Sequence, residues 1–254
     1  MSCSAWDTLH RELDLWEKAG EIATFWWRDD DAVAQTPELQ RLTDLCEQMG
    51  VPVALAAIPA RLEPSLAPFV ENHPVLSVLQ HGYAHRSAAP AGVRKIEIGG
   101  GRSSEDLVGV LLQGRTMLET AFAARFVPVL VPPWNRIDRL HYNDVLQSGL
   151  RGLSTMWARS RRKAQPGLKQ VNAHLDPINW RGGSRFVGEY RALGQLLWHL
   201  YARRTRRRDW DEPTGVLTHH LVQDDDVWAF CRTLMATINA HPAAKWLDAG
   251  RIWN

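Results

Sequence analysis

Two histidines, His81 and His85, stand four residues apart just after the apolar run Val75–Leu79. Imidazole nitrogens are common ligands of divalent ions, and side chains at i and i+4 share one face of a helix. A helical segment after Gln80 would therefore let both rings bind one ion. Alone, the pair is equally compatible with solvated surface histidines, because a metal site also requires a third ligand and an open coordination position.

An acidic run follows the apolar segment Ile22–Trp27. It consists of Asp29, Asp30 and Asp31, preceded by Arg28. Adjacent carboxylates repel one another, and a bound cation offsets that repulsion when they are partly buried. A solvated acidic loop neutralised by the arginine is the simpler interpretation of an isolated run. Because the preceding segment is too apolar to lie in solvent, we expect the run to supply the third metal ligand.

The composition is that of one large globular domain. The chain has 254 residues, 45% of them hydrophobic, a size common among α/β barrels and sufficient for a sizeable core. We expect a single domain over residues 1–254, in which residues 1–20 form an N-terminal helix packed on a barrel. Leu9, Leu13 and Trp16 recur at helical spacing there, and Gly20 is a plausible stop.

Charge and cysteine usage exclude several classes of protein. The net charge is only +2, so no global field favours nucleic acid or a membrane as partner. Cys3, Cys46 and Cys231 are odd in number and far apart, which favours buried, reduced thiols. The sequence opens without a basic segment followed by an apolar core, and no segment is apolar enough to span a bilayer. These features predict a cytoplasmic protein.

Short apolar runs alternate along the chain with longer helical patterns. This alternation predicts parallel strands joined by helical crossovers, hence an α/β fold, and about seven strands fit a closed or nearly closed barrel better than an open sheet. The expected strands are Ile22–Trp27, Val51–Ile58, Val75–Leu79, Phe126–Val131, Gly152–Thr155, Lys169–Ala173 and Gly215–Thr218. The expected helices are Pro37–Met49, Ser104–Ala124, Arg139–Ser148, Glu189–Arg204 and Val227–Asn239.

Five of these strands end in reactive or rigid motifs. They are the acidic run, the histidine pair, the sequences VPPWNR and HLDPINW, and the pair His219 and His220. In a parallel barrel the carboxyl ends of all strands open on one face, where catalytic groups gather. The five motifs are therefore expected to form one site.

The motifs, in this order, resemble those of the polysaccharide deacetylase family, also called the NodB-homology or carbohydrate esterase family 4 fold, over nearly the whole chain. The resemblance implies a distorted seven-stranded (β/α) barrel and metal-dependent hydrolysis of an acylated amine, such as an N-acetylated amino sugar. The matching stretches are Asp30-Asp31, His81-Gly82-Tyr83-Ala84-His85, Val131-Pro132-Pro133-Trp134, Asp176 to Trp180, and Leu217-Thr218-His219.

The resemblance also implies a role for individual residues. Asp31, His81 and His85 would bind a divalent ion, with zinc favoured and cobalt, nickel, manganese and iron as alternatives. Asp30 would act as general base and His219 would protonate the departing amine.

Further roles concern the walls of the site. The backbone N–H of Trp134 would stabilise the oxyanion, on a loop stiffened by the prolines. The remaining implied members of the site are Asp176, which would help to position the base, and the substrate contacts Trp180, Leu217, Pro133 and Arg136.

Two assignments stay open at the level of sequence. The double aspartate of the family aligns with Asp30-Asp31 or with Asp29-Asp30, and the small Ala32 favours the later pair. Adjacent strand residues point to opposite faces, so only one of His219 and His220 can face the barrel mouth. The resemblance favours the first.

One position departs from the family pattern: Val131 stands where an arginine usually precedes Pro-Pro and pairs with the base. A replacement cation could come from Arg28, Arg136 or Arg181. We expect Arg28 or Arg136 to approach Asp30 or Asp176.

The remaining features bear on the ligand. Twelve tryptophans are compatible with a carbohydrate ligand, since indoles stack on sugar faces, although most are expected in the core. The basic run Arg203–Arg208 is either a polyanion patch or a solvated helix end. A second run, Arg159–Lys163, would flank the site mouth and recruit an anionic substrate.

Two alternatives accompany the deacetylase hypothesis. They are a non-catalytic carbohydrate-binding relative and a hydrolase of another non-peptide C–N bond. The expected partner is a small-molecule or oligosaccharide substrate, and the sequence does not determine the oligomeric state.

Overall fold

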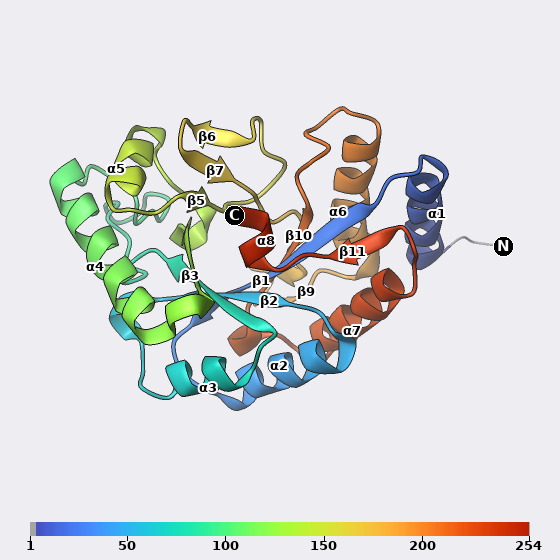
Figure 1. Cartoon of the computed structure of the whole chain (residues 1–254), viewed down its shortest axis with the longest axis horizontal. Coiled ribbons are helices and arrows are strands. Elements are labelled where there is room, and N and C mark those ends of the chain that lie inside the picture. The colour runs from blue at the N-terminus through green and yellow to red at the C-terminus, as the bar shows by residue number, and fades with distance from the viewer. Residues whose placement is uncertain (1–3, 254) are drawn as a thin grey trace.

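The computed structural model describes residues 4–253 as a parallel sheet surrounded by helices (Figure 1). The helices are α1 (Ala5–Lys18), α2 (Pro37–Met49), α3 (Leu66–Asn72), α4 (Ser104–Phe122), α5 (Tyr142–Gln147), α6 (Glu189–Arg204), α7 (Asp225–Asn239) and α8 (Ala249–Trp253). The strands are β1 (Ala23–Ala32), β2 (Val53–Ala57), β3 (Leu76–His81), β4 (Phe126–Val131), β5 (Gly152–Leu153), β6 (Lys163–Gln165), β7 (Leu168–Gln170), β8 (Ile178–Asn179), β9 (Arg185–Phe186), β10 (Thr214–Thr218) and β11 (Ala244–Trp246).

The main sheet follows the order β10-β1-β2-β3-β4-β5-β7, in which every neighbouring pair is parallel. These are the seven strands expected from the sequence, so the α/β prediction is confirmed. Within residues 4–253 the ladder is not continuous between its two ends. The chain after β7 meets β10 through an isolated bridge, Leu175 to Val216, and a few hydrogen bonds, among them the Leu217 N–H donating to the Leu175 carbonyl at 2.8 Å.

The two faces of β1 have different surroundings because alternate strand residues point in opposite directions. Trp26 lies inside the curved sheet with Val129, Val131 and Ile252 of α8. Its ring meets that of Trp253 edge-on, with centroids 5.1 Å apart. Figure 1 shows α8 near the centre of the view, within the ring of helices. The last helix therefore closes the barrel interior.

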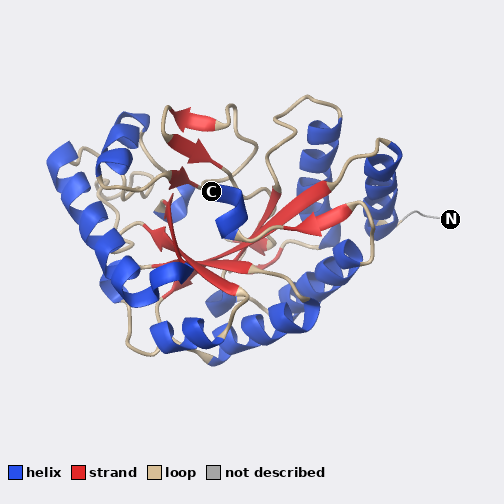
Figure 2. Ribbon diagram, in the orientation of Figure 1, coloured by secondary structure: helices blue, strands red, loops and turns tan. Residues whose placement is uncertain are grey.

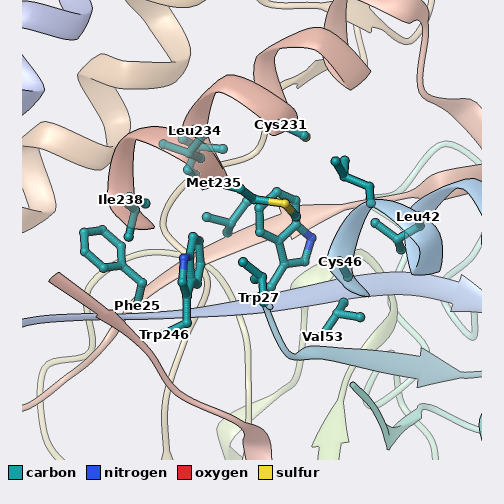
Figure 3. Close-up of a cluster of buried hydrophobic side chains, with 14 of the residues drawn as sticks. Phe25, Trp27, Leu42, Cys46, Val53, Cys231, Leu234, Met235, Ile238 and Trp246 are labelled. Carbon is teal, nitrogen blue, oxygen red and sulfur yellow. The ribbon is translucent and has the colours of Figure 1, made fainter. Parts of the chain in front are cut away.

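The other face of β1 carries the largest core. Figure 2 shows the longer helices outside the sheet, and Figure 3 shows Phe25 and Trp27 beneath side chains of α7 and α2. Cys46 and Cys231 lie in this layer, and burial raises the pKa of both thiols. They are buried, unpaired thiols, as expected. Cys3 lies outside the described residues.

The sequence locates long elements better than short ones. The helices expected over Pro37–Met49 and Glu189–Arg204 have those bounds. The helix expected over Arg139–Ser148 is instead a 3₁₀ turn followed by the short α5. The expectation omitted α3, α8 and the short strands β6, β8, β9 and β11, because segments of two to seven residues carry too little periodicity to recognise.

No helix within residues 4–253 has both the length and the apolar character required to cross a bilayer.

The N-terminal helix α1 packs against α6 through the apolar face expected from its spacing. Leu9, Leu13 and Trp16 are buried, whereas Leu15 on the opposite face is 41% exposed. The chain leaves the helix through Gly20, whose φ of +68° lies in the region that favours glycine.

We predict that Leu13→Ala lowers the free energy of unfolding by about 2–5 kcal/mol, because it opens a cavity between α1 and the barrel. Leu15→Ala on the same helix is the matched control and should cost less than about 0.5 kcal/mol. Urea denaturation followed by circular dichroism measures both. Equal losses for the two variants would show that α1 does not dock in this way.

Candidate active site

Strand parity and one bulge determine where the three consecutive aspartates point. Arg28 and Asp30 share the inner face of β1 with Trp26, whereas Asp29 points outward. The pairing of β1 with β2 shifts register between Asp30 and Ala32. At this bulge Asp31 has a φ of +73°, and its carboxylate points towards the histidine pair instead of the helices.

Asp29 is a buried structural carboxylate on the outer side. It accepts hydrogen bonds from the Thr218 hydroxyl at 2.6 Å and from the His220 backbone N–H at 3.0 Å, and it pairs with the His220 ring. With those contacts satisfied, it does not belong to the group formed by Asp31 and the two histidines. The geometry thus favours Asp30-Asp31 as the functional pair.

Asp31, His81 and His85 converge on one point. Oδ1 of Asp31 lies 3.2 Å from Nε2 of His81 and 3.3 Å from Nε2 of His85, and no other group within residues 4–253 donates a hydrogen bond to it. Two ligands bound to one tetrahedral ion at about 2.0–2.1 Å lie roughly 3.3 Å apart. The three atoms therefore have the spacing of a metal ligand set.

The protonation of His81 also suits a metal ion. Its Nδ1 lies 2.9 Å from the carbonyl oxygen of Val131, which can only accept, so Nδ1 carries the proton. Neutral His81 consequently presents the lone pair of Nε2 to the site. Burial lowers the pKa of His81, but the charges of Asp30 and Asp31 outweigh this effect and raise it overall. This excess of negative charge is what a divalent cation would neutralise.

The histidine pair lies on a turn after β3, so its two rings converge without a helical segment after Gln80. Strand β3 continues through His81, and both Gly82 and His85 have a φ of +56°. The Glu97 carboxylate holds the turn by accepting backbone N–H groups, from Ala84 at 2.8 Å and from His85 at 3.2 Å.

Gly82 is required at that turn, since a Cβ there would lie 2.2 Å from Oε2 of Glu97 and 2.7 Å from Cδ of Pro133. Sequence reasoning missed Glu97. It lies twelve residues beyond His85, in no motif, and its role depends on backbone N–H groups that are not visible in sequence.

Asp30 is held by Arg28, two residues earlier on the same strand face. Nε of Arg28 lies 2.8 Å from Oδ1 of Asp30, and Nη2 donates to Oδ2 at 3.1 Å. The guanidinium is fully buried and also donates to Oδ1 of Asn135 at 2.6 Å and to the Ser154 hydroxyl at 2.7 Å. These contacts fix the carboxylate plane of Asp30.

Arg28 is thus the expected replacement for the arginine absent at Val131, which is buried in the apolar interior. The expectation that Arg28 or Arg136 approaches Asp30 or Asp176 is confirmed by Arg28, whereas the Arg136 guanidinium donates to the Lys95 carbonyl at 2.8 Å. Asp176 has no ion pair with an arginine within residues 4–253. Its carboxylate instead accepts from Nε1 of Trp180 at 2.8 Å and from the Ile178 N–H at 2.9 Å.

On the opposite wall Trp180 packs edge-on against His219, with ring centroids 4.6 Å apart. Nδ1 of His219 is buried and has no hydrogen-bond partner within the described residues. His220 points away into the core towards Asp29. Burial raises the pKa of Asp176, which lies beside this wall. Of the two histidines, His219 therefore faces the mouth.

Trp134 has a φ of +56° on the turn after β4, and the centroids of its ring and the His85 ring are 4.6 Å apart. Within residues 4–253 no hydrogen bond uses its backbone N–H. The other expected substrate contacts differ in exposure. Leu217 and Pro133 are buried, whereas Trp180 is 49% exposed.

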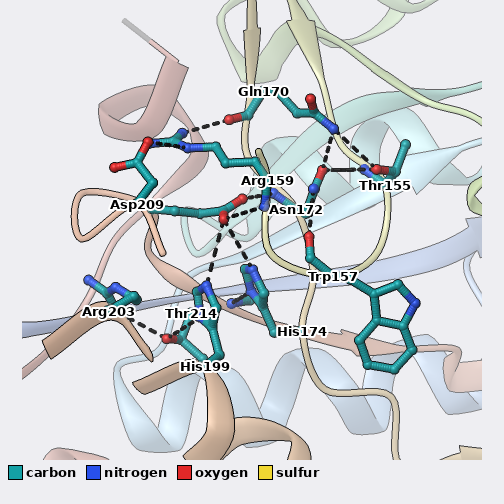
Figure 4. A network of polar contacts seen from close by, with 12 residues as sticks. Thr155, Trp157, Arg159, Gln170, Asn172, His174, His199, Arg203, Asp209 and Thr214 are labelled. Carbon is teal, nitrogen blue, oxygen red and sulfur yellow. Dashed lines mark hydrogen bonds and ion pairs between the residues drawn. The ribbon is translucent and has the colours of Figure 1, made fainter. Parts of the chain in front are cut away.

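A second group, His174, His199 and Glu212, lies fully inside the protein (Figure 4). One carboxylate oxygen of Glu212 lies 3.4 Å and 3.6 Å from Nε2 of the two histidines. Glu212 also accepts backbone N–H groups from Arg159 at 2.8 Å and from Asn172 at 3.0 Å. The group joins α6, β10 and the chain after β7 beneath the sheet.

This second group does not fit a metal ion. The Gly215 N–H donates to Nδ1 of His174 at 2.9 Å, so in the neutral ring Nε2 carries the proton and has no free lone pair. The rings of His174 and His199 stack at 3.3 Å with an interplanar angle of 14°. The two rings therefore lie side by side, and both Nε2 atoms face the same Glu212 oxygen, as in a buried polar network.

Comparison with known proteins identifies the fold. No family model and no curated protein matches the sequence. A candidate polysaccharide deacetylase from Mycobacterium smegmatis matches the structure with 14% identity and a TM-score of 0.64, covering 91% of this chain and 89% of its own.

Two further solved structures extend the comparison. A family 4 acetyl xylan esterase from Clostridium thermocellum, solved with a cobalt ion, has 10% identity, a TM-score of 0.55 and coverage of 90% and 89%. A carbohydrate esterase family 4 pseudoenzyme from Bacillus anthracis has 15% identity, a TM-score of 0.56 and coverage of 92% and 66%. The chain has the fold of these proteins.

The buried His–Glu group should make the fold sensitive to acid. Burial, together with the neighbouring His174, lowers the pKa of His199 to about 3. In the unfolded chain His199 therefore binds a proton as the pH falls through about 6.5, whereas in the folded protein it stays neutral until about pH 3. This contribution to stability is intact above pH 6.5 and falls between pH 6.5 and 3, by roughly 2 kcal/mol at pH 5.

Urea unfolding at a series of pH values tests this expectation. His199→Gln should flatten the decline between pH 6.5 and 5, whereas His10→Gln, at an exposed position on α1, should leave it unchanged. An unaltered slope in His199→Gln would contradict the assignment.

Proposed function

We propose that the protein belongs to the polysaccharide deacetylase family and is a metal-dependent hydrolase that removes an acyl group, such as acetyl, from an N-acylated amino sugar or a similar amide. The observation that carries this proposal is the convergence of Asp31, His81 and His85 beside Asp30. Oδ1 of Asp31 and the lone pair on Nε2 of His81 are oriented to bind a cation at that point. The proposed base, Asp30, lies on the same strand and is held by Arg28.

A divalent ion bound there, with zinc favoured, would polarise the substrate carbonyl and lower the pKa of an attacking water. Asp30 would accept the proton of that water, since Arg28 holds its carboxylate at a fixed angle. The Trp134 N–H would donate to the oxyanion, because no hydrogen bond within residues 4–253 uses it. His219 would transfer a proton to the departing amine from the opposite wall.

The main alternative is a non-catalytic relative that binds carbohydrate with the same fold. The pseudoenzyme among the matching structures makes this alternative concrete. The ion pair between Asp30 and Arg28 argues for an enzyme, since a binding protein has no need to bury and orient a base beside the metal ligands. A hydrolase of another non-peptide C–N bond would use the same groups on a different substrate.

We predict that Asp30→Asn lowers kcat for deacetylation by about 10²–10⁴-fold while the bound metal is retained, because it removes the base and leaves the ligands. His85→Ala should lose metal and activity together. Acetate release and metal content by mass spectrometry measure the two effects. Asp225→Asn, at an exposed carboxylate on α7, is the control and should change neither.

Full activity in both Asp30→Asn and Asp29→Asn would rule out the base assignment. Stoichiometric metal with no hydrolysis of any N-acyl substrate by the wild-type protein would favour the binding protein instead.

We further predict that Arg28→Lys reduces kcat by about 10²-fold, because a lysine cannot make the paired contact with Asp30 and also reach Asn135 and Ser154. Metal content should remain that of the wild type. Arg41→Lys is the matched control, since Arg41 forms an exposed ion pair with Asp225. Unchanged kcat in Arg28→Lys would show that the guanidinium only fills the barrel interior.

A further inference from the structure

A cavity of about 790 Å³ adjoins the candidate active site. Asn135 and Thr155 form part of its wall, and both contact Arg28, the residue that holds Asp30. From there it extends between the segment after β4 and the loop after β5. Its volume lies within the range of small-molecule pockets, about 300–1,000 Å³.

The wall of this cavity is strongly cationic. It includes Arg159, whose charge is already matched by Asp209 at 2.9 Å, and one acid, Asp138, which accepts the Gly100 N–H at 3.1 Å. Four other cations of the wall have no ion-pair partner within residues 4–253: Arg136, Arg139, Arg161 and Lys163.

The positive charge extends from the cavity towards the metal ligands. Arg136 is half-buried, and burial together with the charge of Arg94 lowers the pKa of its guanidinium. Nζ of Lys95 lies 5.8 Å from the centre of the Trp134 ring, which in turn packs on His85. Cations with so few counter-ions around one hollow attract an anion.

The other basic region has a different character. The arginines after α6 lie over exposed aromatic rings, with Arg206 4.8 Å from Trp210, Arg207 5.2 Å from Tyr201 and Arg208 5.7 Å from Trp198. None of them lines the cavity beside the active site.

We propose that the cavity binds an anionic group of the substrate, so that the enzyme selects acylated amines carrying a carboxylate or a phosphate over neutral ones. Guanidinium and ammonium groups are the side chains that recognise both anions. The acyl end of the same molecule would lie at Asp31, His81 and His85, so this inference rests on the proposed function. Neutral polysaccharide chains are excluded as the preferred substrate.

Turnover provides the first test. N-acetylglucosamine is compared with N-acetylglucosamine 6-phosphate and N-acetylmuramic acid, which carry a phosphate and a carboxylate. We expect kcat/KM at low salt to be at least tenfold higher for one anionic substrate than for the neutral sugar. In the double variant Arg161→Gln/Lys163→Gln this ratio should fall at least tenfold. The control Arg207→Gln/Arg208→Gln, with the same loss of charge, should keep it.

Binding provides a second test that does not depend on turnover. Calorimetric titration of metal-loaded Asp30→Asn with the same three ligands should give a Kd at least tenfold lower for an anionic ligand, and this advantage should diminish as salt is raised. Equal, salt-independent affinities that the double variant does not alter would overturn the cavity assignment. Selective anion binding in a wild-type protein that hydrolyses none of the three would overturn the proposed function and leave the anion site standing.

Discussion

Three consecutive carboxylates at the end of β1 are the constraint on which the rest of the site depends. Asp29 and Asp30 are buried and cannot be left charged and unpaired, whereas the side chain of Asp31 is 33% exposed. Asp29 is held on the outer side by Thr218 and His220, and Asp30 on the inner side by Arg28. Only Asp31 faces two imidazole nitrogens and no fixed positive charge, so it is the carboxylate left available for a cation.

The protein has two groups of two histidines and one carboxylate. They differ in which nitrogen of the histidine ring carries the proton. In His81 a carbonyl fixes the proton on Nδ1, which leaves Nε2 free to bind a metal. In His174 a backbone N–H occupies Nδ1, so the proton lies on Nε2 and faces Glu212. The first arrangement suits a metal centre and the second a buried structural network. The hydrogen bond on the far side of the ring decides which role a histidine can have.

Much of this organisation was predictable because it depends on local periodicity. Seven apolar segments predicted the parallel strands, and the spacing of Leu9, Leu13 and Trp16 predicted the buried face of α1. The motifs at the strand ends predicted which side chains meet, since parallel strands place their carboxyl ends together. The conformation of the histidine pair was not predictable from the motif, because the acceptor that shapes its turn, Glu97, comes from outside the motif.

The sequence by itself determined which residue types can form the site and at which strand ends they stand, since the alternation of strand and helix locates those ends. Only the tertiary structure decided which aspartate faces His81 and His85, because a single bulge reverses the direction of Asp31. It also decided that Arg28, and not Arg136, replaces the missing arginine at Val131, and that the basic residues after β5 line a cavity beside Asn135. These outcomes depend on side-chain direction and on contacts between distant segments, which spacing along the chain does not encode.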